Sequence, residues 1–240
     1  MTSTRFSLRI HCANFSAPSS PNSCFVPRGG ASLLTDAMVT AIDREDGEWR
    51  ITTRAGEVRS RLLVNAAGAW ASEVAAMAGA MRIAITPYRR TIAQLATDPA
   101  MAADMPLVMD ALGRFYFKPE AGGRLWLSPH DESAVEPHDV APEELDVAIA
   151  IDRFEQAVDW RVVRRERAWA GLRSFALDRL PVYGFDAKAP GFFWFAGQGG
   201  FGIQTAPAAA MVAASVLLAA PLPELVAGID PERYSPTRFG

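Results

Sequence analysis

The amino-acid sequence predicts a mixed α/β (α+β) fold in which one lobe is interrupted by a second lobe built on an antiparallel sheet. The apolar run Leu62-Leu63-Val64 is typical of a strand covered on both faces. In the stretch 192–220, an aromatic run, a glycine cluster and a long uncharged segment predict a strand, a tight turn and a helix. Between these segments lie several strand-like runs separated by Gly/Pro turns, and this order predicts two lobes.

The composition is that of an ordinary globular protein and excludes several classes. Half of the 240 residues are hydrophobic and 21% are charged, which argues against global disorder. The net charge of -3 gives no general attraction for nucleic acid, so no nucleic-acid partner is expected. The N-terminus has basic residues but no continuous apolar segment, so we expect no signal peptide and a cytoplasmic protein.

Both cysteines, Cys12 and Cys24, lie near the N-terminus. They form a disulfide with each other or are unpaired thiols in a reducing compartment, and the sequence favours unpaired thiols. The later residues contain no thiol for catalysis or metal binding.

The first lobe is expected from two separate parts of the chain, 31–85 and 173–225. Residues 1–30 show no sustained period, so they are left unassigned and are expected to be irregular. The turn signals Asp46-Gly47 and Ala55-Gly56 separate the first strand candidates. The candidates are strands at 32–43, 48–54 and 57–68 and a short helix at 69–80.

The second lobe is expected at 86–172, and residues 226–240 form a tail. Its strand-like runs are followed by a helix candidate at 142–158, where Pro142 suits a first helical turn. The apolar residues expected along one side of this helix are Leu145, Ile149 and Phe154.

The uncharged segment 206–222 has to be considered as a membrane span. It contains Pro207 and Pro221, is rich in alanine, and falls short of the roughly 20 strongly apolar residues that a span needs. We therefore expect a helix buried in a globular core and no transmembrane segment.

Glycines at 197, 199, 200 and 202 allow positive φ and remove Cβ atoms, so several backbone N–H groups can face a bound group. The helix that starts directly afterwards adds the positive end of its dipole and its unpaired donors. The cluster predicts contact with an anion or with the carbonyl edge of a ring, and tight strand–helix packing is the alternative. It is not the P-loop, because no Gly-Lys-Ser/Thr follows the glycines.

The segment "VNAAGAW" at 64–70 is another strand that runs into small residues. Ala67 and Gly68 would let either a large planar ligand or another backbone come close, and the sequence does not favour one over the other.

Two side chains of the middle region are candidates for binding a substrate. Arg173 can hold a carboxylate through two parallel hydrogen bonds, and the alternative is a surface arginine. Tyr116 alternates with Phe115 and Phe117, so it either points a hydroxyl into a cavity or packs in the core.

The segment 130–138 offers side chains that bind metals, but it looks like a solvated loop and no metal site is expected. These side chains are His130, Asp131, Glu132, Glu136 and His138.

Four segments, in this order, resemble the C-terminal part of the D-amino-acid oxidase-like family of FAD-dependent oxidoreductases, which includes glycine oxidase, sarcosine oxidase and D-amino-acid dehydrogenases. They are "LLVNAAGAWASEVAAMAGA", "RFYFKPEAGGRLWLSPHDE", "WAGLRSFALDRLPVYGFD" and "GFFWFAGQGGFGIQTAPAAAMVAASVLL". The resemblance covers about 32–218, and it implies a partial FAD-binding lobe with an inserted antiparallel-sheet substrate lobe.

The resemblance also implies roles for individual residues. Val39 matches a position that touches the adenine side of FAD through its backbone, and Ala67 and Gly68 match a strand end close to the cofactor. Arg173 matches the arginine that binds the substrate carboxylate, and Tyr116 matches a tyrosine that helps to hold the substrate. The residues implied to lie against the isoalloxazine ring are Gly199, Gly200, Phe201, Gly202, Ile203 and Gln204.

The sequence departs from the family pattern in two ways. The family begins with a strand, a GxGxxG turn and a helix that hold the FAD pyrophosphate, and residues 1–30 contain no such unit. The resemblance therefore implies a truncated C-terminal portion that needs a missing N-terminal lobe or a partner chain. The cysteine that carries covalent flavin in sarcosine oxidases is absent too, so noncovalent FAD is expected.

The implied reaction is oxidation of a small amino acid or amine. Hydride passes from the substrate carbon to the flavin and leaves an imine that hydrolyses, while Arg173 and Tyr116 orient the substrate. A 2-hydroxy acid is the rival substrate, because Arg173 would bind either carboxylate. A further alternative is a non-catalytic fragment or subunit that needs a partner chain to bind FAD. No residue is assigned as a catalytic acid or base.

Overall fold

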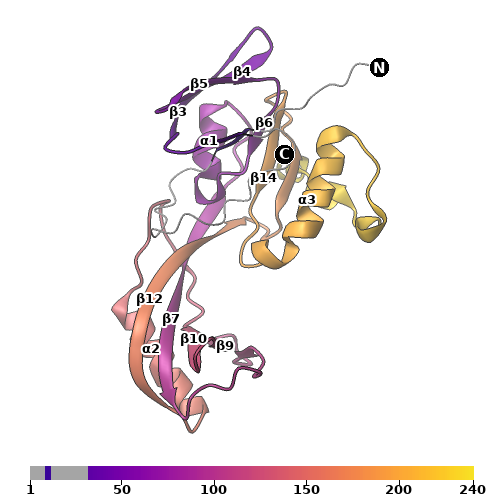
Figure 1. Ribbon diagram of the computed structural model, residues 1–240. Helices are drawn as coiled ribbons and strands as arrows, with labels where there is room; N and C mark the ends of the chain where they lie inside the picture. The colour runs from indigo at the N-terminus through magenta and orange to yellow at the C-terminus, as the bar shows by residue number, and fades with distance from the viewer. Residues whose placement is uncertain (1–8, 12–31) are drawn as a thin grey trace. The chain divides into compact units, whose positions relative to one another are not determined.

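The computed structural model describes residues 9–11 and 32–240. Cys12 and Cys24, and with them the prediction of unpaired thiols, lie outside the described residues. The described chain separates into two compact units. Unit 1 contains the described residues up to Ala84, together with Pro181–Ala196 and Ile203–Gly240, and unit 2 contains Ile85–Leu180 and Gly197–Gly202. In Figure 1, most of the ribbon coloured from magenta to orange belongs to unit 2.

Unit 1 contains short strands, two α-helices and several 3-10 turns. Its strands are β1 (Arg9–His11), β2 (Ser32–Leu34), β3 (Val39–Glu45), β4 (Glu48–Thr53), β5 (Gly56–Ser60), β6 (Leu63–Asn65), β13 (Val182–Phe185) and β14 (Phe192–Ala196). Its helical elements are η1 (Gly68–Trp70), α1 (Ala71–Met77), α3 (Gly202–Leu218), η2 (Glu224–Val226), η3 (Pro231–Tyr234) and η4 (Pro236–Phe239). The strand β1 lies in the stretch that was expected to be irregular, and it pairs in parallel with β2.

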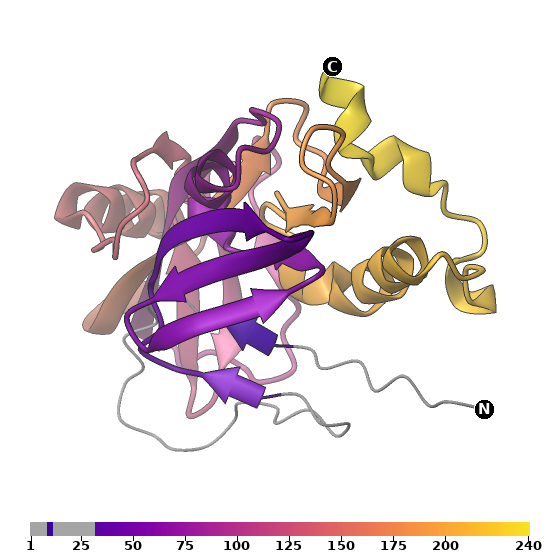
Figure 2. The ribbon, with the colours of Figure 1, turned by 90° about the horizontal axis from the view of Figure 1, so that it is seen from above.

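The antiparallel sheet β3–β4–β5 forms as the turn signals predict. Asp46 and Gly47 connect β3 to β4 with φ values of 49° and 83°, the conformation that two-residue hairpin turns favour. Trp49, Ile51 and Val58 are buried on one face of the sheet. Figure 2 looks onto these three strands, drawn in purple at the front.

The run expected as one strand at 57–68 is two strands in two different sheets. After β5 the chain turns at residues 61–62, and the N–H of Leu63 donates a hydrogen bond to the carbonyl of Gly191 over 2.9 Å. From there β6 runs parallel to β14, which pairs with β13 on its other edge. The apolar run leaves the first sheet because it pairs with β14, whose Phe192 and Trp194 are fully buried.

A buried carboxylate joins α1 to the β13–β14 hairpin. Asp186 is 6% exposed and accepts hydrogen bonds from the N–H of Met81 and the indole of Trp194, each at 2.9 Å. Its other oxygen accepts from the N–H groups of Lys188 and Ala189, each at 2.8 Å. Because each oxygen has two donors, this buried charge is fully hydrogen-bonded.

The helix α3 is buried only along part of one face, so the prediction of a helix buried in the core is wrong for its first half. Ile203 is 90% exposed, and Pro207 lies inside the helix near its start. The buried residues follow further along and are Ala209, Val212, Ala213 and Ser215. Among the helices of the described chain, none has the length and apolar character needed to cross a membrane.

Unit 2 is a sheet packed against one helix. Its strands are β7 (Ile85–Asp98), β8 (Val108–Met109), β9 (Tyr116–Glu120), β10 (Arg124–Ser128), β11 (Ser133–Ala134) and β12 (Arg161–Ala176), and its helix is α2 (Glu144–Ala157). The sheet order is β11–β7–β10–β9–β8, and β12 pairs antiparallel with β7 from end to end. Figure 1 shows this long pair with α2 beside it. The predicted antiparallel sheet is confirmed.

The helix α2 covers one face of this sheet. Of the apolar residues expected to face the core, Phe154 is fully buried, whereas Leu145 is 71% exposed. The buried positions of α2 are Val147, Ala150 and Phe154, which recur at helical spacing. They pack against the sheet residues Ala93, Leu95, Phe115, Phe117, Leu125 and Leu127.

The opposite face of the sheet is called the Arg173 face here. Side chains alternate across a strand and paired residues share a face. The register pairs Arg173 with Tyr88 and Trp169 with Ile92, so these residues point away from α2. By the same alternation this face carries Tyr88, Arg90, Tyr116, Trp126, Ser128, Trp169, Gly171, Arg173 and Phe175.

Candidate functional site

The glycine loop, residues 197–202, packs against the end of β12 within unit 2. Gly197 and Gly199 have φ values of 75° and 57°, which side chains rarely adopt. The N–H of Gly199 donates a hydrogen bond to the carbonyl of Ser174 over 2.8 Å. A Cβ on Gly199 would lie 2.3 Å from the Phe175 ring, so packing alone requires glycine at this position.

Gly200 has a different environment. A Cβ on Gly200 would meet no atom within 4 Å, so packing in the structure does not require glycine there. Phe201 is 60% exposed, and Gln204 is exposed as well. The two explanations of the cluster therefore apply to different residues, because Gly199 is needed for packing while Gly200 borders open space.

Arg173 lies next to the residue that holds the glycine loop. It is partly buried, and its cross-strand partner is Tyr88. Within the described ranges no carboxylate lies within ion-pair distance of its guanidinium, and its five N–H donors are available to a ligand. The structure thus brings together the predicted carboxylate-binding arginine and the predicted flavin loop.

Tyr116 shares the Arg173 face but is not a neighbour of Arg173. The strands β10 and β7 lie between β9, which carries Tyr116, and β12. Three strand spacings of about 4.8 Å put the two strands about 14 Å apart. The side chains of Tyr116 and Arg173 would have to span most of this distance for one small ligand to touch both.

The structure adds His130 to the surroundings of Tyr116. Its ring lies edge-on to the Tyr116 ring, with centroids 5.6 Å apart at 80°. His130 has a φ of 56°, and its Nδ1 lies 2.6 Å from the carbonyl oxygen of Gly113. The sequence suggested His130 only as a metal ligand. Its contact with Tyr116 depends on the positive φ of His130, and no sequence pattern predicts a positive φ at a histidine.

The carboxylates beside His130 form contacts within the protein. Asp131 accepts hydrogen bonds from the N–H and the hydroxyl of Thr91, at 2.7 and 2.9 Å. Glu132 pairs with Arg90 at 3.0 Å and with Arg179 at 2.8 Å. Asp131 departs from the expected solvated loop, because only 6% of its side chain is exposed, whereas Glu132, Glu136 and His138 are exposed. In the part of the chain that is described, no three His, Cys, Asp or Glu side chains gather as metal ligands.

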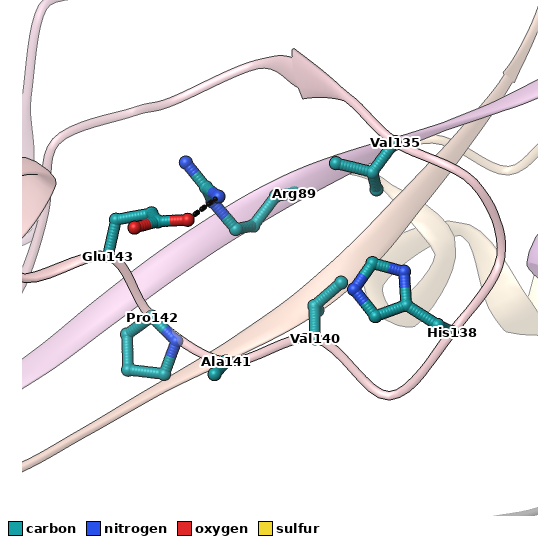
Figure 3. A pocket seen from close by; sticks show the side chains of 7 residues that line it. All are labelled: Arg89, Val135, His138, Val140, Ala141, Pro142 and Glu143. Atoms are coloured by element: carbon teal, nitrogen blue, oxygen red, sulfur yellow. Dashed lines mark hydrogen bonds and ion pairs between the residues drawn. The ribbon is translucent and has the colours of Figure 1, made fainter.

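A cavity of about 330 Å³ lies elsewhere in unit 2 (Figure 3). Arg89 donates hydrogen bonds across it to Glu143 at 2.8 Å and to Asp146 of α2 at 2.7 Å. Since Arg89 lies on the α2 side of the sheet and already has carboxylate partners, this cavity is distinct from the Arg173 face. Its lining residues are Arg89, Val135, His138, Val140, Ala141, Pro142 and Glu143.

The remaining predicted cofactor residues lie in unit 1. Ala67 and Gly68 follow β6, where the buried Asn65 accepts a hydrogen bond from the N–H of Ala67 and donates one to the carbonyl of Ala71. Gly68 has a φ of 57° and starts the 3-10 turn η1. Val39 is partly buried at the start of β3, beside an irregularity in the pairing with β4.

Comparison with known sequences identifies a family and several relatives. A family model described as "FAD dependent oxidoreductase" matches residues 26–216. Mouse mitochondrial dimethylglycine dehydrogenase is 28% identical over 226 residues, which covers 85% of this chain and 26% of that protein. Subunit HcnC of hydrogen cyanide synthase from Pseudomonas aeruginosa is 29% identical over 184 residues, covering 74% of this chain and 42% of the subunit.

Comparison with solved structures shows the same fold. Glycine oxidase from Geobacillus kaustophilus superposes with a TM-score of 0.71 at 22% identity, over 88% of this chain and 54% of the oxidase. L-Proline dehydrogenase from P. horikoshii superposes with a TM-score of 0.70 at 23% identity, over 88% of this chain and 55% of the dehydrogenase. The chain spans about half the length of these structures. The family match confirms the resemblance read from the sequence, and the chain belongs to the FAD-dependent oxidoreductase family.

Proposed function

We propose that the chain supplies the flavin-facing loop and the substrate-carboxylate site of an oxidoreductase that oxidises a small amino acid or amine. The observation that carries this proposal is the guanidinium of Arg173, which has no side-chain partner in the part of the chain that the structure describes and lies one residue from the Ser174 carbonyl that holds Gly199. An arginine without a carboxylate partner, beside a glycine loop with an open side, suits an anionic substrate placed next to a planar cofactor.

The described residues fit FAD at its ring end. Gly200 leaves space beside the loop, and Phe201, Ile203 and Gln204 are exposed. Backbone N–H groups at the start of α3 would favour negative charge on the ring. In this proposal Val39, Ala67 and Gly68 of unit 1 lie along the rest of the cofactor, and no cysteine is available after Cys24 for covalent attachment.

The side chains of this chain would bind and orient the substrate. The planar fork of Arg173 matches a carboxylate through two parallel hydrogen bonds and fixes the substrate carbon relative to the loop. In this proposal the side chains of Tyr116 and Arg173 reach toward each other over β10 and β7, and the hydroxyl of Tyr116 helps to hold the substrate. When bound, FAD supplies the acceptor for the hydride.

A 2-hydroxy acid fits the same arginine, because Arg173 recognises the carboxylate and not the amine. Small amino acids and 2-hydroxy acids are therefore compared as substrates in one experiment. The alternative is an arrangement in which a second chain or an N-terminal lobe holds the FAD pyrophosphate, because residues 1–30 contain no strand–GxGxxG–helix unit. The GxGxxG spacing of Gly197, Gly199 and Gly202 lies in the loop that we assign to the flavin ring.

The test is anaerobic reduction of bound flavin, followed by visible absorption. The purified chain with FAD should lose its oxidised flavin band on addition of small α-amino acids or N-methylglycine, and not on addition of amines without a carboxylate. If only 2-hydroxy acids abolish the oxidised flavin band, the substrate is a 2-hydroxy acid and not an amine. Flavin that binds but is reduced by none of these compounds would contradict the proposed reaction.

A further inference from the structure

We propose that Arg179 makes the Arg173 face selective for substrates with two acidic groups, one bound by Arg173 and the second by Arg179. The inference rests on the proposed function, since it names the class of substrate for the same site. The ligands meant are amines with a carboxylate and a further acidic group, carried either on the nitrogen or on the side chain.

The backbone at Arg179 points to a role for its side chain. Arg179 lies in the turn between β12 and β13 with a φ of 63°, and its N–H donates to the carbonyl of Ala176 over 2.9 Å. Glycine adopts this conformation without strain, whereas a residue with a Cβ does not. An arginine in a turn that favours glycine indicates that its guanidinium is used.

The guanidinium of Arg179 lies against two aromatic rings of the Arg173 face. Its Cζ is 4.0 Å from the centroid of the Phe175 ring and 6.0 Å from that of Tyr88. Tyr88 is the cross-strand partner of Arg173, and Phe175 lies two residues further along the same face of β12. The two aromatic rings, which contact each other edge to face, are therefore neighbours of Arg173 and contact Arg179.

Part of the Arg179 guanidinium is available to a ligand. Its side chain is 51% exposed, and only Nη2 donates to Glu132, at 2.8 and 3.1 Å. Within residues 9–11 and 32–240, Nε and Nη1 of Arg179 have no acceptor. The donors that remain can hold a carboxylate while the pair with Glu132 stays intact.

Charge in this part of the face is positive. Glu132 is shared by Arg90 and Arg179, and Arg173 has no carboxylate partner among the described residues. Asp178, in the same turn as Arg179, accepts a hydrogen bond from the N–H of Leu180. A second acidic group would be attracted to Arg173 and Arg179, because Arg179 shares its carboxylate partner with Arg90.

Space is present next to these groups. Gly171 lies opposite Arg90 in the pairing of β12 with β7, two residues before Arg173. A Cβ on Gly171 would meet nothing within 4 Å, so no side chain fills this position of the face. The main body of a small ligand can lie there while its acidic groups reach the arginines.

The test is isothermal titration calorimetry on the full chain, with matched pairs of ligands that differ by one carboxylate. N-(Carboxymethyl)glycine is compared with N-methylglycine, and aspartate with alanine, so that an acid on nitrogen is distinguished from one on the side chain. The dicarboxylate of at least one pair should bind about tenfold more tightly, as one charge-assisted hydrogen bond predicts. Arg179→Gln should remove this preference without changing the affinity for the monocarboxylate.

Three controls complete the design. Arg179→Lys keeps the charge and should retain part of the preference. Arg161→Gln removes an exposed charge at the far end of β12 and should leave the preference unchanged, and thermal unfolding of each variant confirms folding.

Equal affinity within both pairs, an equal loss for both ligands in Arg179→Gln, or no binding of any of the four compounds would overturn the inference. The titrations are repeated without FAD, so a preference that persists when no flavin binds supports the inference even if the proposed oxidation fails.

Discussion

The N–H of Gly199 donates a hydrogen bond to the carbonyl oxygen of Ser174 over 2.8 Å, and this bond fixes the glycine loop one residue from Arg173. Phe175, the next residue of β12, lies so close to Gly199 that a Cβ there would be 2.3 Å from its ring. These contacts place the predicted flavin loop and the predicted carboxylate arginine at the same end of β12.

Gly199→Ala and Gly200→Ala form a matched pair of substitutions. We expect Gly199→Ala to lower the melting temperature, because the added methyl overlaps Phe175 and the residue must keep a φ of 57°, at a cost of about 2 kcal/mol. Gly200→Ala should leave the melting temperature nearly unchanged and weaken FAD binding by about tenfold, since it fills space that the ring would occupy. Thermal unfolding and FAD titration of both variants measure this. Equal melting temperatures for the two variants would contradict the packing role of Gly199.

Arg173→Gln should raise the KM for carboxylated substrates by about 100-fold while flavin binding is kept, because the charge-assisted pair contributes about 3 kcal/mol. Arg173→Lys should recover only part of the loss, since an ammonium cannot form two parallel hydrogen bonds with a carboxylate. Steady-state kinetics together with an FAD titration separate the two effects. An unchanged KM in Arg173→Gln would remove this arginine from the substrate site.

Asp186→Asn should destabilise unit 1 by about 3 kcal/mol. The carboxylate accepts hydrogen bonds from the N–H of Met81 and the indole of Trp194. The amide nitrogen of asparagine is a donor and cannot accept these bonds, so buried donors would lose their partners. Asp43→Asn is the control, because the Asp43–Arg50 ion pair is exposed and should contribute less than about 1 kcal/mol. Chemical denaturation measures both free energies of unfolding, and a similar small change in both would show that the Asp186 hydrogen bonds do not stabilise unit 1.

Asp110 makes the turn before β9 sensitive to acid. Its carboxylate accepts hydrogen bonds from the side chain and the N–H of Arg114, and these bonds hold the pKa of Asp110 well below its ordinary value of 3.8. Because the pKa is lower in the folded than in the unfolded chain, the stabilisation is complete above the ordinary pKa and is lost as the pH falls below it.

The same turn carries Gly113, whose carbonyl contacts His130. We expect NMR titration to show the pKa of Asp110 rising toward 3.8 in Arg114→Gln. A pKa that stays equally low in this variant would show that the backbone N–H groups alone cause the shift.

The sequence predicts the elements whose signals are local. The hairpin turn at Asp46-Gly47, the long strands of unit 2 and the helices α1 and α2 follow from turn residues and periodicity. The sequence-based predictions are wrong where strand pairing is non-local. The run 57–68 divides between two sheets because β6 pairs with β14, which lies more than a hundred residues later in the chain.

The site was predicted one residue at a time, and its arrangement depends on strand register. That Arg173 lies beside the glycine loop follows from one hydrogen bond to Ser174. The wide separation of Tyr116 from Arg173 follows from the order of four strands, which the sequence does not specify. The contact of Arg179 with Phe175 could not be foreseen, because it depends on a positive φ at an arginine.

The most direct test of the account is the visible spectrum of the purified 240-residue chain after incubation with excess FAD and gel filtration. The account predicts a flavin band that elutes with the protein, is weakened by Gly200→Ala, and changes when a small carboxylate occupies the Arg173 site. A chain that elutes without flavin, both alone and together with a separately produced strand–GxGxxG–helix domain, would contradict the claim that the glycine loop and Arg173 form part of a flavin site.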